Sequence, residues 1–123
     1  MATSARRAAA QALHGVFGRG RRVPEDWDAD LSGEDAGLAQ AILGPALRHW
    51  GRLQAWALPQ LKDPGRGLPL GSRVCLALGL VQLAWLDGVA AHAAVHEAVE
   101  LAADRTLGFP PHRGLLNALL RRA

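Results

Sequence analysis

The chain has 123 residues, a length that fits one compact domain, and half of them are apolar. Its single cysteine, Cys75, excludes an internal disulfide, and the scarcity of Ile, Thr and Tyr argues against a β-sheet protein. The net charge is +3, and Lys62 is the one lysine among 14 Lys and Arg residues. Arginine suits bidentate contacts with phosphate, and a GC-rich genome would give the same bias. We therefore expect an all-α protein of basic character.

The N-terminal segment predicts a first helix from Thr3 or Ser4 to Phe17. Small and apolar residues share one face of this helix, and Arg6 and Arg7 point away from it in the first turn. The helix dipole disfavours cations there, so the two side chains either lie in solvent or bind an anion. The segment lacks an uninterrupted apolar run, so we interpret it as mature cytoplasmic protein. An acid-free, arginine-bearing start is also typical of a transit peptide.

Charge is arranged in blocks along residues 18–35. The segment from Gly18 to Leu31 has the glycine, proline and charge density of a mobile loop. Its first part is basic and suited to an RNA backbone, with Arg19, Arg21 and Arg22. An acidic stretch from Glu25 to Asp35 follows, which either keeps the loop off its own basic surface or meets a basic protein partner. Trp27 is predicted to cover the core as a lid, with an exposed stacking surface as the alternative.

A second helix is predicted to begin at Gly33, because Ser32 followed by Asp35 resembles a capping box. Gly44-Pro45 should interrupt it and give a kinked helix or two helices. The core candidates that follow are Leu47, Trp50, Leu53, Leu58 and Leu61. The segment from Lys62 to Pro69 is the clearest break, and it divides one domain, residues 1–123, into helical halves at about 1–62 and 69–123.

The longest apolar stretch runs from Leu70 to Leu86 and predicts a central core helix that starts near Pro69 and Ser72, is most apolar over residues 74–86 and ends at Asp87-Gly88. It is too short to cross a bilayer, so we expect no membrane partner. The next helix is predicted over Ala90–Asp104, with an alanine-rich buried face that implies close approach of a neighbouring helix. Its polar line is His92, His96, Glu97, Glu100 and Asp104. A final helix, His112–Arg122, should bury Leu115, Leu116, Leu119 and Leu120.

No reaction centre is visible in the sequence. His92, His96 and Glu100 have the i, i+4, i+8 spacing of an incipient metal site, but three ligands on one straight helix span too far to converge on one ion. Apolar surroundings should raise the pKa of Cys75, which argues against a nucleophile. We therefore predict no catalytic residues, no metal and no cofactor, and we favour binding over catalysis.

Several stretches in order resemble the NusB family of RNA-binding helical domains. They are SARRAAAQALHGVF, LSGEDAGLAQAILGPALRHWGRLQAWAL, LALGLVQLAWLDGVAAHAAVHEAVELA and GLLNALLRR, which together cover nearly the whole chain. The resemblance implies two packed subdomains with about six to seven helices in all. It also implies RNA contact by the arginine-rich motif, which falls on Arg6 and Arg7. Glu97 and Asn117 match other family motifs, and we expect both to be structural caps or network residues.

The resemblance is to two kinds of protein. NusB itself is a transcription antitermination factor that binds single-stranded RNA and a ribosomal protein of the small subunit. The same domain is the N-terminal part of RsmB-type 16S rRNA cytosine-5 methyltransferases, which NALLRR, GLVQL and HAAVHEAV resemble more closely. This chain stops at Ala123 without a Rossmann domain, so we expect a freestanding NusB-like protein or a non-catalytic piece of a longer enzyme.

The sequence thus predicts an RNA-binding module acting in antitermination or rRNA biogenesis. Its expected RNA contacts are Arg6, Arg7, Arg19, Arg21 and Arg22. The alternatives are an rRNA-binding module of a methyltransferase, a protein-interaction module that docks a ribosomal or transcription partner, and a structural homodimer. The sequence leaves the oligomeric state and the preferred RNA open.

Overall fold

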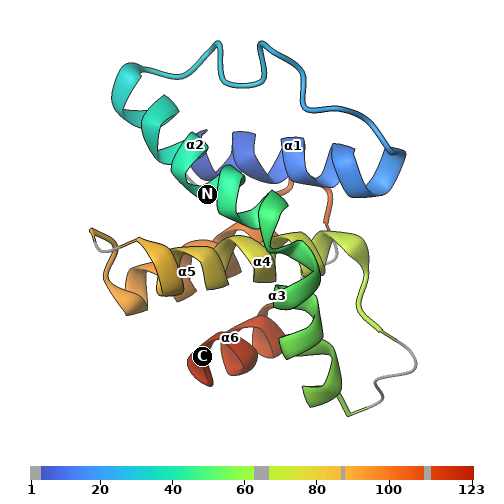
Figure 1. Cartoon of the computed structure of the whole chain (residues 1–123). Helices are drawn as coiled ribbons and strands as arrows, with labels where there is room; N and C mark the ends of the chain where they lie inside the picture. The colour runs from blue at the N-terminus through green and yellow to red at the C-terminus, as the bar shows by residue number, and fades with distance from the viewer. Residues whose placement is uncertain (1–3, 63–66, 87, 110–111) are drawn as a thin grey trace.

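The computed structural model describes residues 4–62, 67–86, 88–109 and 112–123, and these fold into six α-helices and one short 3-10 helix with no strand among them (Figure 1). The helices are α1 (Ser4–Arg19), α2 (Gly33–Arg48), α3 (Trp50–Ala57), η1 (Leu58–Gln60), α4 (Leu70–Trp85), α5 (Ala91–Ala103) and α6 (Arg113–Arg121). The all-α prediction is confirmed, and so is the expected number of helices.

Helix α4 is the centre of the molecule, and it contacts each of the other five α-helices. Every residue from Gly71 to Gln82 is buried except Arg73. The predicted core helix is therefore correct, and it begins directly after Pro69. Burial raises the pKa of the Cys75 thiol to about 12, as the apolar surroundings indicated. None of the described helices combines the length and the apolar character needed to cross a bilayer.

Close helix packing around α4 depends on small residues. A Cβ atom at Gly79 would lie 2.9 Å from Leu120 Cδ2 of α6 and 3.0 Å from Ala98 Cβ of α5. The buried face of α5 consists of Ala94, Ala98, Leu101 and Ala102. The alanine-rich face of α5 thus lets its backbone approach α4 closely, which is the arrangement that the sequence predicted.

The first half departs from the prediction in three details. Helix α1 continues beyond Phe17 to Arg19 and ends at Gly20, whose φ of 63° favours glycine. Ser32 precedes α2 but makes no side-chain capping hydrogen bond. Pro45 lies inside α2, and the break falls instead at His49, whose φ of −111° and ψ of 14° are not helical. A single missing N–H donor at Pro45 is tolerated because the rest of α2 packs on α1 and α4.

The segment between α1 and α2 arches over α1 in Figure 1 and is made of short turns. The N–H group of Trp27 donates to the carbonyl of Pro24 at 3.2 Å, and that of Ala29 donates to the carbonyl of Asp26 at 3.0 Å. Trp27 is half-buried and packs against the core, which confirms its interpretation as a lid.

Parts of other predictions lie outside the described residues. They are the possible cap at Thr3, residues 63–66 of the break between the two helical halves, and Asp87 at the end of the central helix. The division of the domain into halves at about 1–62 and 69–123 stays a prediction. Among the predicted core residues of this region, Leu53 is buried, and Leu47, Trp50 and Leu61 pack against the core, whereas Leu58 is only half-buried in η1.

Candidate nucleic-acid interface

Arg6 lies inside the molecule, where it joins three helices. Its Nε atom donates a hydrogen bond of 2.7 Å to Oε1 of Gln82 on α4, and its Nη1 atom lies 3.9 Å from Oε2 of Glu97 on α5. The residue is 8% exposed, whereas the sequence suggested that it points away from the apolar face. Gln82 is fully buried and donates in turn to the carbonyl of Leu78 at 3.1 Å. Glu97, which we expected to be a structural cap or a network residue, thus takes part in a network with Arg6.

Arg7 faces the C-terminal end of α5. Its Nη1 atom lies 4.0 Å from Oδ2 of Asp104, and 26% of the Arg7 side chain is exposed. Asp104 was predicted on the polar line of its helix, but it is buried at 5% exposure. Its Oδ1 atom accepts hydrogen bonds from the hydroxyl of Thr106 at 2.5 Å and from the backbone N–H of Thr106 at 2.9 Å. The hydroxyl hydrogen bond is the main cause that lowers the pKa of Asp104, with burial acting against it.

In each carboxylate one oxygen atom has a cation as its neighbour and, among the described residues, no hydrogen-bond donor. Within the described part of the chain, Glu97 Oε2 and Asp104 Oδ2 are buried atoms that accept no hydrogen bond. Their counter-charges are the guanidinium groups of Arg6 and Arg7. A buried carboxylate is costly without a cation beside it, so these two arginines stabilise the contact between α1 and α5.

The other predicted arginines lie at the opposite end of α1 and are exposed: Arg19, Arg21 and Arg22. The left-handed Gly20 reverses the chain, and the N–H group of Arg21 then donates to the carbonyl of Gly15 at 3.3 Å. At 1.5 Å of rise per residue, Arg6 and Arg19 are about 20 Å apart along the helix. The structure therefore separates the five predicted arginines into two groups.

Two neighbouring hollows bring the second group together. A hollow of about 580 Å³ is lined by Arg19, Arg21, Gln11, His14 and Phe109, among others. The ring of His14 stacks on that of Phe109 with 4.9 Å between centroids. A smaller hollow of about 240 Å³ is lined by Arg21, Arg22 and Trp27. No Asp or Glu among the described residues lines either hollow, so no carboxylate of the lining competes for these cations.

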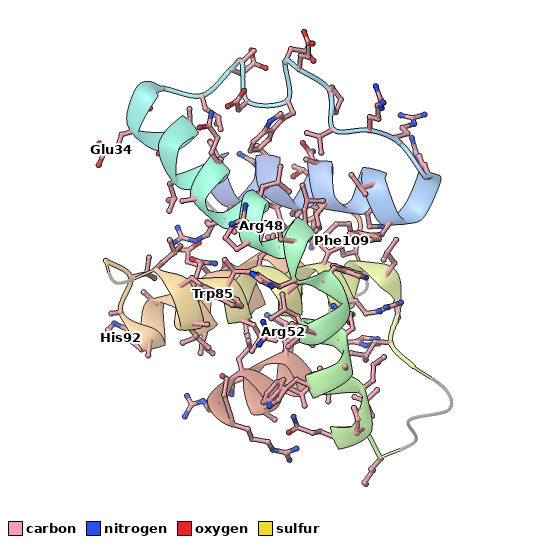
Figure 2. All side chains as sticks on the ribbon, in the orientation of Figure 1. Glu34, Arg48, Arg52, Trp85, His92 and Phe109 are labelled. Carbon is pink, nitrogen blue, oxygen red and sulfur yellow. The ribbon has the colours of Figure 1, made fainter. Side chains whose placement is uncertain are left out.

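Sequence reasoning did not single out Gln11, His14 or Phe109. Phe109 is remote from α1 in sequence, and its place follows from Gly71: a Cβ atom there would lie 2.6 Å from Phe109 Cγ. An aromatic residue in the Pro-rich segment after α5 was the available signal, but only the fold shows that it reaches α1. Figure 2 shows Phe109 on the side of the molecule where α4 begins.

The acidic stretch and the histidines of α5 have other surroundings. Asp28 accepts a hydrogen bond of 2.7 Å from Gln40 Nε2, and the remaining acidic residues from Glu25 to Asp35 are exposed.

His92 and His96 line a hollow of about 710 Å³ between α5 and α6 together with Arg113 and Arg121. Among the described residues, no three His, Cys, Asp or Glu side chains are placed to hold a metal ion. Asn117 accepts a hydrogen bond of 3.1 Å from Arg121 Nε within α6.

Comparison with known proteins adds a family and two relatives. The model of the NusB family matches residues 3–123. The ribosomal RNA small subunit methyltransferase B of Xanthomonas campestris pv. campestris is 36% identical over 126 residues, which cover 98% of this chain and 28% of that protein. The protein of the same name from Pseudomonas putida is 35% identical over 120 residues, covering 98% of this chain and 27% of the relative. The chain thus spans little more than a quarter of the length of these curated relatives.

Proposed function

Because this chain belongs to the NusB family, we propose that it binds single-stranded RNA and that the exposed arginines after α1 hold the phosphates. The observation that carries the proposal is the acid-free hollow in which Arg19 and Arg21 lie beside Gln11, His14 and Phe109. Guanidinium groups pair with phosphate oxygens, and amide and ring groups suit unstacked bases. Arg22 in the neighbouring hollow extends the same basic surface.

Ribosomal RNA is the ligand that the relatives favour over an antitermination signal. Both named relatives are rRNA small subunit methyltransferases, and the matched region is a small part of each. We therefore propose that these residues form an rRNA-binding module, with transcription antitermination as the alternative within the same family. We do not propose that this chain itself transfers a methyl group. We also propose that the protein acts in the cytoplasm, as a role with either kind of RNA would suit.

Arg6 and Arg7 take different parts in this proposal. Arg6 is nearly buried against Gln82 and Glu97, so its contacts support a role in holding α1 on α4 and α5. Arg7 remains a proposed phosphate contact, since about a quarter of its side chain is exposed at 4.0 Å from Asp104. An RNA strand that reached Arg7 from Arg19 would follow the length of α1, which several nucleotides can span.

The test is a salt titration of RNA binding. Fluorescence anisotropy of a labelled single-stranded RNA would be measured for the wild type and for the triple variant Arg19→Gln, Arg21→Gln, Arg22→Gln over a range of salt concentrations. For single strands the logarithm of the binding constant falls with log salt by about 0.7 per neutralised phosphate. Loss of three contacts should therefore lower affinity and reduce this slope by about 2.

A variant with the same change of net charge is the control. Arg113→Gln, Arg121→Gln, Arg122→Gln removes three exposed cations from the region of α6, away from the two hollows. It should leave the salt slope near that of the wild type. Equal slopes for the wild type and the first variant would contradict the proposed site, and a wild type that binds no RNA would contradict the proposed function.

A protein partner is a second candidate, favoured by the exposed acidic residues between Glu25 and Asp35. Exposed carboxylates steer association with a basic surface, such as that of a small-subunit ribosomal protein. A complex captured from ribosomal proteins that persists after RNase treatment would support it. Loss of the complex with RNase would instead assign the association to RNA.

A further inference from the structure

Two stacked ring pairs meet at the junction between α2 and α3, and the proposed RNA site does not include them. His49 stacks on Trp85 of α4 with 4.8 Å between centroids and 8° between ring planes. The next residue, Trp50, stacks on Phe17 of α1 at 4.2 Å and 11°. Because His49 and Trp50 are consecutive, the two pairs are close neighbours. Residues of α1, α3 and α4 thus contribute rings to these two pairs: the Phe17–Trp50 pair lies near Arg73 at the start of α4, and Trp85 is at its end.

The outer ring of each pair is open to solvent. Trp85 is 43% exposed and Phe17 is 40% exposed, and they are the large apolar side chains that stand out as exposed among the described residues. Single exposed apolar side chains are common, but here each of the two exposed rings is also stacked on a neighbouring ring. Each is fixed by its stacked partner and is therefore ready to receive a further flat ring at little cost in entropy.

Arginines lie near both pairs of rings. The guanidinium of Arg73 lies 5.4 Å from the centre of the Trp50 ring. Arg52 lines a hollow of about 530 Å³ together with Trp56 and Trp85, and no Asp or Glu of the described residues lines it. Arg48 is exposed directly before His49. Within the described part of the chain, neither Arg48 nor Arg52 takes part in an ion pair.

Aromatic rings interleaved with unpaired arginines are the arrangement that single-stranded nucleic acid recognises. Bases stack on the rings, and phosphates pair with the guanidinium groups. We propose that the face formed by Phe17, Trp50, His49, Trp85, Arg48 and Arg52 is a second contact surface for single-stranded RNA, on which bases stack at Trp85 and Phe17. Figure 2 shows Trp85 and Arg52 on one side of the molecule, where α3 crosses α4. This inference rests on the proposed RNA-binding function.

The end of α1 contributes a residue to each of the two surfaces. Phe17 lies two residues before Arg19, which lines the hollow with Arg21 and Phe109. A strand held by Arg19 and Arg21 would meet Phe17 and Trp50 first and would then have to follow α4 to the His49–Trp85 pair at its other end. The first surface holds phosphates, and the second adds stacking of bases, so the two contribute differently to affinity.

The test compares a base-bearing strand with a strand that has no bases. A short labelled oligouridylate and an abasic ribose-phosphate strand of the same length would be titrated with the wild type, Trp85→Leu and Trp85→Phe. Leucine keeps an apolar side chain without a π face, and phenylalanine keeps the ring. We expect Trp85→Leu to bind the oligouridylate about tenfold more weakly, Trp85→Phe to bind it nearly as the wild type does, and all three to bind the abasic strand equally.

The outcomes separate this inference from the proposed function. If Trp85→Leu binds the oligouridylate as tightly as the wild type, while the variant lacking Arg19, Arg21 and Arg22 binds both strands weakly, only the stacking surface is overturned. The exposed rings would then fit a protein partner. If the wild type binds neither strand, both proposals fail. Circular dichroism of each variant confirms folding, which the exposure of Trp85 should preserve.

Discussion

Arg6 was predicted to contact RNA, but its side chain instead joins helices inside the protein. Its hydrogen-bond partner Gln82 is 76 positions away in the sequence, and its ionic partner Glu97 is on yet another helix. The spacing of apolar residues in α1 placed Arg6 off the main apolar face. It could not show that Gln82 of α4 and Glu97 of α5 provide polar partners for Arg6 inside the protein. A buried glutamine such as Gln82 needs a hydrogen-bond partner, and that requirement was the only hint.

Replacing Arg6 should therefore destabilise the fold. Arg6→Met keeps the length of the side chain but leaves Glu97 without its cation and Gln82 without its donor. We expect the free energy of unfolding to fall by about 3 kcal/mol in urea denaturation. The exposed Arg113→Met is the control and should stay within about 0.5 kcal/mol of the wild type. Unchanged stability of Arg6→Met together with weak RNA binding would assign Arg6 to the RNA instead.

Asp104 gives the fold a dependence on pH. Its folded-state pKa lies below the ordinary value of 3.8, chiefly because the Thr106 hydroxyl donates to it. Its charge therefore stabilises the fold above about pH 4, and this contribution is lost as the pH falls through the folded-state pKa. Asp104→Asn should lower the urea midpoint at pH 7, and its difference from the wild type should narrow at acid pH. The exposed Asp30→Asn should differ little at either pH, and a constant gap for Asp104→Asn would contradict this account.

At the scale of the elements, the apolar pattern predicted which helices exist better than where they end. The run from Leu70 to Leu86 marked the central helix, and the alanines of α5 marked its close packing. The end of α1 and the break after α2 were misplaced, at Phe17 and Pro45. The end of α1 follows from a local glycine, the left-handed Gly20, whereas α2 passes through Pro45 because it packs on α1 and α4. Local sequence does not contain that information.

Alanine substitutions at two helical glycines, Gly79 and Gly37, distinguish the effect of helix packing on stability from the effect of helix propensity. Gly79→Ala brings a Cβ atom within 3.0 Å of both Leu120 and Ala98, and we expect it to destabilise the protein by about 1–3 kcal/mol. Gly37→Ala adds a Cβ atom in open space within α2 and should stabilise by about 0.5–1 kcal/mol. Thermal unfolding of the two variants measures both effects. A stabilising Gly79→Ala would mean that α6 can move away from α4 without loss.

At the scale of the whole molecule, α4 determines how the domain should unfold. It contacts every other α-helix, so neither helical half keeps a complete core without it. We expect a single unfolding transition, with coincident curves from far-ultraviolet circular dichroism and tryptophan fluorescence in urea. Two separate transitions would indicate that residues 1–62 and 69–123 are independent units.

The sequence indicated which ligand to propose for the candidate site, but not which residues come together to form it. Blocks of arginine and the resemblance to an RNA-binding family pointed to RNA, and three of the five arginines are exposed as that requires. The aromatic partners were not foreseen, because Phe17, Trp50 and Trp85 come from three different helices and read as core residues in the sequence. Only the packing of α1, α3 and α4 shows that two of these rings emerge at the surface.

The adjacency of His49 and Trp50 also fixes the length of the chain between α2 and α3. One residue inserted after Arg48 would rotate α3 by about 100° relative to α2, since a helix has 3.6 residues per turn. Trp50 would then point away from Phe17. The inserted residue, and not His49, would lie opposite Trp85. This junction should thus accept many substitutions but no insertion or deletion, unlike the long connection that precedes α2.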